Sequence, residues 1–300
     1  MVRTKWNIEN IPDQSGKIVI VTGANSGTGF EVAKALAMKG AKVIMACRNL
    51  DKANNAKSQI MDEYPHSNLK IIQLDLGSLS SIRKFGEDFT ERFQELHILC
   101  NNAGVMMPPY QKTDDGFELQ FGVNHLGHFA LTGLLLNTLL NTKDSRVVTM
   151  SSTGHKLGKI HFDDLNWEND YNRTRAYGMS KLANLLFAYE LQRNLQNTGK
   201  STISLASHPG WTRTNLQRHV SLFRLFNPLL AQKPQMGALP MLYAATSMEA
   251  QGGGYYGPGG IFEIRGYPKK VKSNKRSYNK ETAKKLWQIS EELTGVKYVF

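Results

Sequence analysis

The sequence predicts an α/β fold in which a doubly wound parallel sheet carries helices on both faces. Short apolar runs alternate with segments of helical periodicity along most of the 300 residues. A glycine-rich turn joins the first apolar run to the first helical segment. Because no linker divides the chain and the α/β alternation is its only repeat, we expect one domain over residues 1–300.

The first unit predicts a nucleotide site. Residues 17–22 form a β-branched run that is typical of a strand buried on both faces. The glycine-rich turn follows, then a helical pattern to Met38 and a second strand at 42–47. Glycines in such a turn let the backbone approach a pyrophosphate at the helix N-terminus. The spacing is Gly-x-x-x-Gly-x-Gly, and we place these residues at the cofactor: Gly23, Asn25, Ser26, Gly27, Thr28 and Gly29.

Arg48, directly after the second strand, indicates which nicotinamide cofactor binds. An acid at this place would bind a ribose 2′-hydroxyl, whereas an arginine accommodates a 2′-phosphate. From the start of the second strand, no acid occurs until Asp51. This favours NADP(H); the alternative is a surface arginine that starts a loop.

The alternation continues to the end of a sixth strand. Further strands are expected at 69–74, 97–100, 146–150 and 202–207, and further helices at 51–64, 79–93, 117–140 and in the run that ends at Leu195. Right-handed crossovers then predict the Rossmann-like strand order 3-2-1-4-5-6, with the ligand at the carboxyl ends of the strands.

Tyr177 and Lys181 form a candidate catalytic pair. Four residues apart on a helix, they share one face. A free tyrosine titrates near pH ~10, and a neighbouring cation lowers that pKa. The pair therefore suits acid/base catalysis between a carbonyl and an alcohol. The alternative is two amphipathic side chains on a solvated helix.

Charge and cysteine content bound the partners. Of the net charge of +12, +8 lies in residues 265–285, which hold nine Lys or Arg and one Glu. This basic segment predicts a solvated surface, or contact with an acidic membrane surface or an anionic ligand, and not nucleic acid. Two cysteines, no secretory leader and no apolar run of about 20 residues predict a cytoplasmic protein without an integral membrane segment.

Taken together, the motifs resemble the short-chain dehydrogenase/reductase family over roughly residues 15–265. The matching elements are Thr22-Gly23-x-x-x-Gly27-x-Gly29, Asp75, Asn101-Asn102-Ala103-Gly104, Asn124, Ser152, Tyr177-x-x-x-Lys181 and Pro209-Gly210. Residues 45–49, 123–129 and 180–184 further resemble the branch that holds retinol dehydrogenases and light-dependent protochlorophyllide reductases.

The resemblance implies roles for four catalytic residues. Tyr177 would exchange the proton with the substrate oxygen, and Lys181 would lower the pKa of the tyrosine and bind the nicotinamide ribose. Ser152 would hydrogen-bond the substrate oxygen where charge develops. Asn124 would position a water that links Lys181 to solvent.

The resemblance also implies further cofactor contacts. Asp75 would meet the adenine, Asn102 the adenosine ribose, and Thr214 the carboxamide, with Thr212 as a weaker candidate. The remaining cofactor positions are Leu76, Ala103, Gly104, Pro209 and Gly210.

The sequence departs from the family at two places. Thr28 stands where the family usually has an aliphatic residue, so the packing of the first helix or the cofactor fit is expected to differ. Ser152 and Tyr177 are 25 residues apart, an insert that is usual in the retinol dehydrogenase branch. The cysteine pattern of protochlorophyllide reductases is not evident.

Three weaker patterns complete the analysis. Residues 211–235 are rich in Leu and Phe, which predicts either an apolar substrate lid or an amphipathic helix packed on the core or on a subunit partner. His125 and His128 are expected to be ordinary helix side chains, so no metal site is predicted. Residues 265–300 form a basic C-terminal extension in which 280–293 reads as an amphipathic helix.

We therefore expect an NADPH-preferring oxidoreductase that interconverts a bulky apolar carbonyl and its alcohol. The alternatives are light-dependent reduction of a tetrapyrrole C=C bond, and a non-catalytic nucleotide-binding scaffold. The partner is a small-molecule substrate, and a homo-oligomer remains open.

Overall fold

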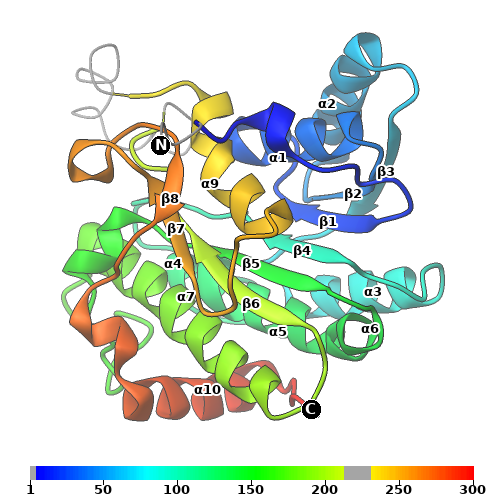
Figure 1. The fold of residues 1–300 in the computed structure, drawn as a ribbon. Coiled ribbons are helices and arrows are strands. Elements are labelled where there is room, and N and C mark those ends of the chain that lie inside the picture. The colour runs from blue at the N-terminus through cyan, green and yellow to red at the C-terminus, as the bar shows by residue number, and fades with distance from the viewer. Residues whose placement is uncertain (1–4, 213–230) are drawn as a thin grey trace.

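An eight-stranded sheet organises the computed structural model, which describes residues 5–212 and 231–300. Its order is β3-β2-β1-β4-β5-β6-β7-β8 (Figure 1). The strands are β1 (Ile18–Thr22), β2 (Lys42–Cys47), β3 (Asn68–Gln73), β4 (Ile98–Asn101), β5 (Arg146–Met150), β6 (Ile203–Ser207), β7 (Tyr255–Pro258) and β8 (Pro268–Lys270). All neighbouring strands pair in parallel except β7 and β8, which are antiparallel. The predicted order 3-2-1-4-5-6 is confirmed for the first six strands.

Strands β7 and β8 were not predicted. β7 reads Tyr-Tyr-Gly-Pro and β8 reads Pro-Lys-Lys, so neither contains an apolar run or an apolar/polar alternation. They are strands because β6 offers β7 a parallel neighbour and β7 offers β8 an antiparallel one. Tertiary pairing here overrides weak local preference.

Helices cover both faces of the sheet. They are α1 (Gly27–Met38), α2 (Leu50–Glu63), α3 (Leu79–Thr90), α4 (Leu119–Phe121), α5 (Gly127–Leu134), α6 (Leu136–Asn141), α7 (Arg173–Gln196), α9 (Pro234–Thr246) and α10 (Lys280–Thr294). Helices α1, α2 and α9 share one apolar core with the sheet, whereas α3, α5, α6 and α7 share the other. In Figure 1, α10 lies outside α7, as the outermost layer.

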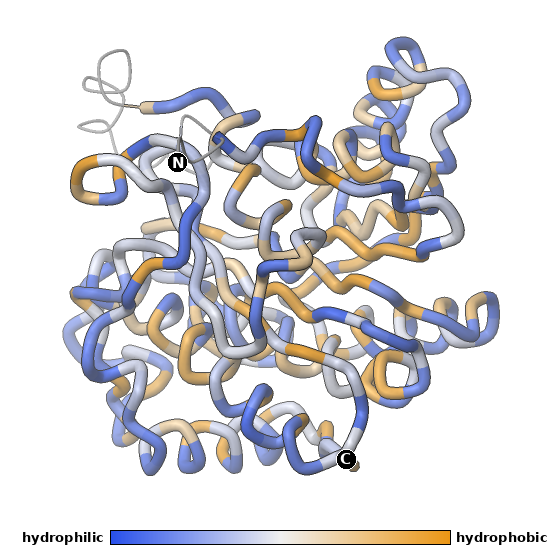
Figure 2. Tube along the Cα trace, viewed as in Figure 1, coloured by the Kyte–Doolittle hydropathy of each residue, from blue (hydrophilic) through white to orange (hydrophobic). Residues whose placement is uncertain are grey.

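Alternation along the central strands supplies both cores. In β1, Val19 and Val21 face the α1 side and Ile20 faces the α7 side, and all three are fully buried. The same alternation places Met45 and Ile44 of β2 in opposite cores. Figure 2 shows the result, with hydrophobic residues concentrated along the central strands and hydrophilic ones on the outer helices and turns.

The segment 117–140, expected as one helix, is broken into four pieces. A π-helical turn, η2 (Gly122–Leu126), separates α4 from α5, and a kink at Leu135 separates α5 from α6. π-turns inside helices often occur at functional sites, and this one carries Asn124. The C-terminal helix expected at 280–293 is confirmed as α10.

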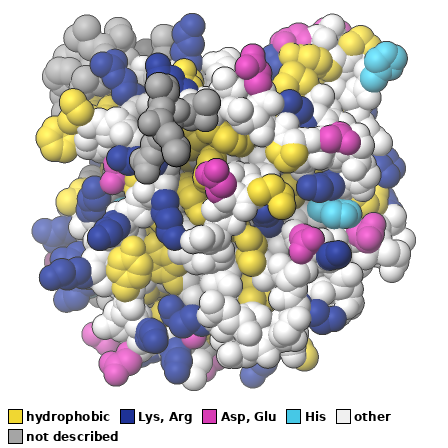
Figure 3. Space-filling model, in the orientation of Figure 1, with side chains coloured by type: hydrophobic (Ala, Val, Ile, Leu, Met, Phe, Trp, Pro, Cys, Tyr) yellow, Lys and Arg dark blue, Asp and Glu magenta, His cyan; other side chains and the backbone are white. Residues whose placement is uncertain are grey.

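The basic segment is part of the packed structure. It contains β8, the 3-10 turn η6 (Lys275–Tyr278) and the start of α10, whose Leu286 and Trp287 are buried. In Figure 3, Lys and Arg gather on the left of the molecule, where Figure 1 draws the orange C-terminal segment. No helix in the described part of the chain is long and apolar enough to cross a membrane.

Candidate active site

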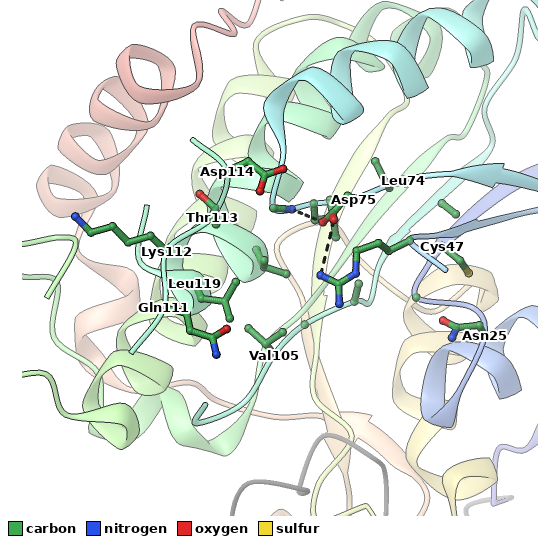
Figure 4. A pocket seen from close by; sticks show the side chains of 18 residues that line it. Asn25, Cys47, Leu74, Asp75, Val105, Gln111, Lys112, Thr113, Asp114 and Leu119 are labelled. Atoms are coloured by element: carbon green, nitrogen blue, oxygen red, sulfur yellow. Dashed lines mark hydrogen bonds and ion pairs between the residues drawn. The ribbon is translucent and has the colours of Figure 1, made fainter. Parts of the chain in front are cut away.

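A cavity of about 380 Å³ opens at the carboxyl ends of the strands in the first half of the sheet (Figure 4). Seven of the predicted cofactor residues line it, namely Gly23, Asn25, Arg48, Asp75, Leu76, Ala103 and Gly104. These residues follow β1, β2, β3 and β4, so the sheet brings together four loops that are far apart in sequence.

The N-terminus of α1 adjoins this cavity. Ser26 is the N-cap residue, yet its side chain makes no capping hydrogen bond, and the first turn contains no acid. The N–H groups of this turn therefore remain suited to an anion such as a pyrophosphate. This arrangement fits the predicted role of residues 23–29.

Thr28 and Asn102 explain the departure from the family pattern at the start of α1. The Thr28 hydroxyl donates to Oδ1 of Asn102 at 3.0 Å, and Nδ2 of Asn102 donates to the carbonyl of Thr22 at 2.8 Å. The Thr28 hydroxyl thus fixes the orientation of Asn102, which is predicted to bind the adenosine ribose. An aliphatic residue at position 28 could not make this bond.

Arg48 and Asp75 both line the cavity. Nη1 of Arg48 is 3.7 Å from Oδ2 of Asp75, and 70% of the Arg48 side chain is exposed. Oδ1 of Asp75 accepts the N–H of Gly77 at 2.9 Å. The ion pair with Asp75 involves only Nη1 of Arg48, which leaves the rest of the guanidinium available to a phosphate.

Gly104 connects the cavity to the predicted catalytic residues. A Cβ atom at this position would lie 2.9 Å from Oδ1 of Asn124 and 3.4 Å from Nζ of Lys181. Only glycine allows this approach. A cofactor that extends from Arg48 past Gly104 would therefore reach Lys181.

Tyr177 and Lys181 lie on α7 as expected, and both are buried. Nζ of Lys181 is 5.8 Å from the centre of the Tyr177 ring and donates to the carbonyl of Met150 at 3.3 Å. Burial raises the pKa of Tyr177, and a hydrogen bond with Ser152 acts in the opposite direction. The structure thus brings the predicted tyrosine, lysine and serine together at the end of β5.

The expected lowering of the Tyr177 pKa is not found. Burial raises the pKa of Tyr177, because a low-dielectric site disfavours the phenolate, and this effect exceeds that of Ser152. Burial also lowers the pKa of Lys181 to about 8. The spacing predicted the neighbours correctly, but it could not predict how far both are removed from water.

Asn124 is held by the loop after β4. Its Oδ1 accepts the N–H of Val105 at 2.7 Å, and its Nδ2 donates to the carbonyl of Val105 at 3.0 Å and to Oγ of Ser180 at 2.9 Å. The backbone carbonyl oxygen of Asn124 lies 3.0 Å from Nδ1 of His128. The water-positioning role remains a prediction, made for a residue whose side chain is fully hydrogen-bonded here.

Pro209, Gly210 and Thr212 follow β6 and do not line this cavity. Oγ1 of Thr212 donates to the carbonyl of Pro209 at 2.6 Å. Thr214 and most of the predicted lid, residues 213–230, lie outside the described residues.

Sequence reasoning missed much of the cavity wall. The additional lining residues are Ala46, Cys47, Leu74, Gly77, Val105, Gln111, Lys112, Thr113, Asp114, Leu119 and Val123. Most belong to the loop between β4 and α4 or to the ends of β2 and β3. For those in the loop after β4, the only available indication was their position after Asn101-Asn102-Ala103-Gly104.

His125 and His128 are both fully buried, and burial lowers their pKa values to about 3 and about 4. Nε2 of His125 contacts Oγ of Ser290, and Nε2 of His128 contacts Oγ1 of Thr22. Across residues 5–212 and 231–300, no group of three or more His, Cys, Asp or Glu could hold a metal ion.

Comparisons with known proteins agree with this geometry. Residues 17–224 match the family described as short chain dehydrogenase. Human retinol dehydrogenase 12 is 44% identical over 289 residues, which cover 94% of this chain and 88% of that protein.

Two solved structures are similar as well. An uncharacterized protein from Mycobacterium paratuberculosis is 39% identical with a TM-score of 0.84, covering 99% of this chain and all of the other. A short chain dehydrogenase from Shigella flexneri complexed with NADP is 24% identical with a TM-score of 0.65, covering 81% of this chain and 97% of that one, and at this identity it supports the fold alone.

Proposed function

The chain belongs to the short chain dehydrogenase family, and on that premise we propose that it is an NADPH-dependent oxidoreductase interconverting a bulky apolar carbonyl and its alcohol. One observation carries the proposal. The cavity lined by Arg48 is also lined by Gly104, where a Cβ atom would lie 3.4 Å from Nζ of Lys181 on the helix of Tyr177. This proximity supports a nucleotide site beside the acid/base pair, although Tyr177 and Lys181 do not themselves line the cavity.

The fit to NADP(H) rests on the residues themselves. The α1 N-terminus would hold the pyrophosphate, Asn102 the adenosine ribose, and Arg48 the 2′-phosphate. When bound, this cofactor supplies the hydride that reduces the carbonyl carbon.

The chain's own residues handle the proton. Tyr177 gives its hydroxyl proton to the substrate oxygen in reduction and takes it back in oxidation. Ser152 donates a hydrogen bond to the same oxygen, where negative charge develops. Lys181, whose Nζ lies 5.8 Å from the centre of the Tyr177 ring, would bind the nicotinamide ribose.

The substrate class is supported by the relatives. Retinol, named in retinol dehydrogenase 12, is a bulky apolar alcohol. We also propose that the protein works in the reducing environment of the cytoplasm, because Cys47 and Cys100 are both free and buried.

The decisive experiment measures oxidation of NADPH and NADH in the dark against aldehydes and ketones of increasing apolar bulk. We expect turnover with NADPH that improves with bulk. Turnover that appears only under illumination would favour the C=C reductase. Tight NADPH binding without turnover in dark or light would favour the scaffold.

A further inference from the structure

His155 connects the turn that follows Ser152 to the C-terminal part of the chain. It lies in η3 (Thr153–Leu157), the turn that follows β5, and its side chain is fully buried. Its Nδ1 is 2.5 Å from the carbonyl oxygen of Ser152, and its Nε2 is 3.1 Å from the backbone nitrogen of Asn274. One ring thus connects two segments that are 119 residues apart in sequence.

The partner of Nε2 fixes the tautomer of the His155 ring. A backbone N–H can only donate, so Nε2 must be the unprotonated nitrogen and Nδ1 must carry the proton. Nδ1–H therefore donates to the Ser152 carbonyl. Burial lowers the pKa of His155 to about 4, which keeps the ring neutral and this assignment intact at physiological pH.

The Ser152 carbonyl accepts a second donor. The backbone N–H of His155 lies 3.1 Å from the same oxygen. Two donors on one carbonyl set the orientation of the peptide that leaves Ser152. The orientation of this peptide fixes the backbone at Ser152, and the N–H of Gly154, which donates to Oγ at 3.1 Å, fixes the direction of the hydroxyl.

The basic C-terminal segment holds the other side of η3. Nδ2 of Asn274 donates to the carbonyl of His155 at 3.0 Å, and Arg276 donates to the carbonyl of Gly158 at 2.7 Å. Oδ1 of Asn274 accepts the N–H of Ser277 at 3.1 Å, which ties Asn274 to η6. The turn that follows Ser152 is therefore held by hydrogen bonds within η3 and by hydrogen bonds from the C-terminal segment.

We propose that His155 is a positioning residue for Ser152, and that the backbone N–H of Asn274 holds its ring in the required tautomer. The proposal rests on the proposed function, because it takes Ser152 as the donor to the substrate oxygen. It also gives the segment after β8 a role in catalysis that does not depend on its charge.

A double-mutant cycle with His155→Leu and Ser152→Ala tests the proposal. In the wild-type background we expect His155→Leu to lower kcat on the order of 10- to 100-fold, with the Kd for NADPH unchanged. In the Ser152→Ala background, His155→Leu should lower kcat by less than about twofold, because the hydroxyl that His155 positions is gone. Equal fold losses in both backgrounds would mean that His155 acts on folding in general and would overturn the proposal.

A conservative variant separates positioning from loss of fold. His155→Asn keeps an N–H that reaches toward the Ser152 carbonyl, so it should recover part of the kcat lost in His155→Leu. If Ser152→Ala itself turns over at the wild-type rate, the serine of the proposed function fails and this inference fails with it. Equal losses leave the proposed function standing, so the two failures are distinguishable.

Asn274→Pro and Asn274→Ala test the tautomer. Asn274 has a φ of −70°, which proline adopts without strain. Both variants lose the side-chain amide, but only Asn274→Pro loses the N–H that faces Nε2. We expect kcat of Asn274→Pro to be lower than that of Asn274→Ala by about tenfold, with melting curves recorded for both. Equal kcat values would overturn the role of this N–H.

Discussion

Nζ of Lys181 lies 5.8 Å from the centre of the Tyr177 ring, and both side chains are buried on α7. Burial raises the pKa of the tyrosine and lowers that of the lysine to about 8, so each is displaced toward its neutral form. Near pH 7 the tyrosine keeps the proton it is proposed to donate, and the lysine is charged in most molecules. At neutral pH the tyrosine is therefore in the protonated form that reduction requires, and the lysine is close to losing its charge.

Tyr177→Phe removes the proposed acid without removing the ring. We expect kcat to fall by about 10³-fold or more, while the Kd for NADPH stays within a few-fold. Tyr189→Phe is the matched control, since Tyr189 is buried on the same helix and its hydroxyl contacts Oγ of Ser273 at 2.9 Å. A Tyr177→Phe enzyme that is as active as the control would contradict the mechanism.

We expect Lys181→Met to abolish activity and to raise the stability of the folded protein. The folded-state pKa of about 8 lies below the ordinary value of 10.5, so the unfolded chain binds more protons between these pH values and stability rises with pH there. Below pH 8 the buried cation costs its full penalty, on the order of 3 kcal/mol. Urea unfolding at pH 7 should therefore show Lys181→Met to be more stable than wild type by about this amount, with activity lost.

The gap between Lys181→Met and wild type should narrow between pH 8 and pH 10, as the wild-type lysine loses its proton. A gap of constant size across this range would show that the buried amine does not carry the penalty.

Arg48→Asp tests the choice between the two cofactors. An acid at this position repels a 2′-phosphate and can bind a ribose 2′-hydroxyl. The ratio of kcat/KM with NADPH to that with NADH should fall by at least about tenfold. Arg92→Asp makes the same charge change at an exposed residue outside the cavity and should leave the ratio unchanged. Equal ratios in both variants would remove Arg48 from the site.

Gly29→Ala should weaken NADPH binding and lower stability. Its Cβ would lie 2.3 Å from the carbonyl oxygen of Gly23 and 2.4 Å from Nδ2 of Asn102, so the glycine turn and the ribose ligand would both have to move. We expect the Kd for NADPH, measured by fluorescence titration, to rise by about tenfold or more. Gly86→Ala, whose nearest contact is a Leu134 side-chain atom at 3.3 Å, should bind NADPH as wild type does. Equal Kd values would show that the turn accommodates the methyl group.

The strands that carry the site could be predicted because their residues are locally consistent with their structure. β1 reads Ile-Val-Ile-Val-Thr and is buried on both faces, whereas β7 and β8 depend on a neighbouring strand that no local pattern reveals. The π-turn at η2 was missed for a similar reason. Its residues continue the helical pattern, and the two bonds between Asn124 and Val105 hold the turn from outside the helix.

The site could be predicted in its residue types and less well in its electrostatics. Lys181 is only 4% exposed, which is rare for a lysine and depends on how β5 and α7 pack. The bond between Thr28 and Asn102 joins residues 74 positions apart and was visible in the sequence only as a departure from a family pattern.

Strand β8 also limits how copies of this chain could assemble. It is three residues long, two of them exposed lysines, and it occupies the backbone groups of β7 that would otherwise be free. At the opposite border, β3 presents Lys70 and two exposed amide side chains, Asn68 and Gln73. Short, charged border strands oppose the joining of two sheets edge to edge. A homo-oligomer of this protein would therefore be built from its helical faces.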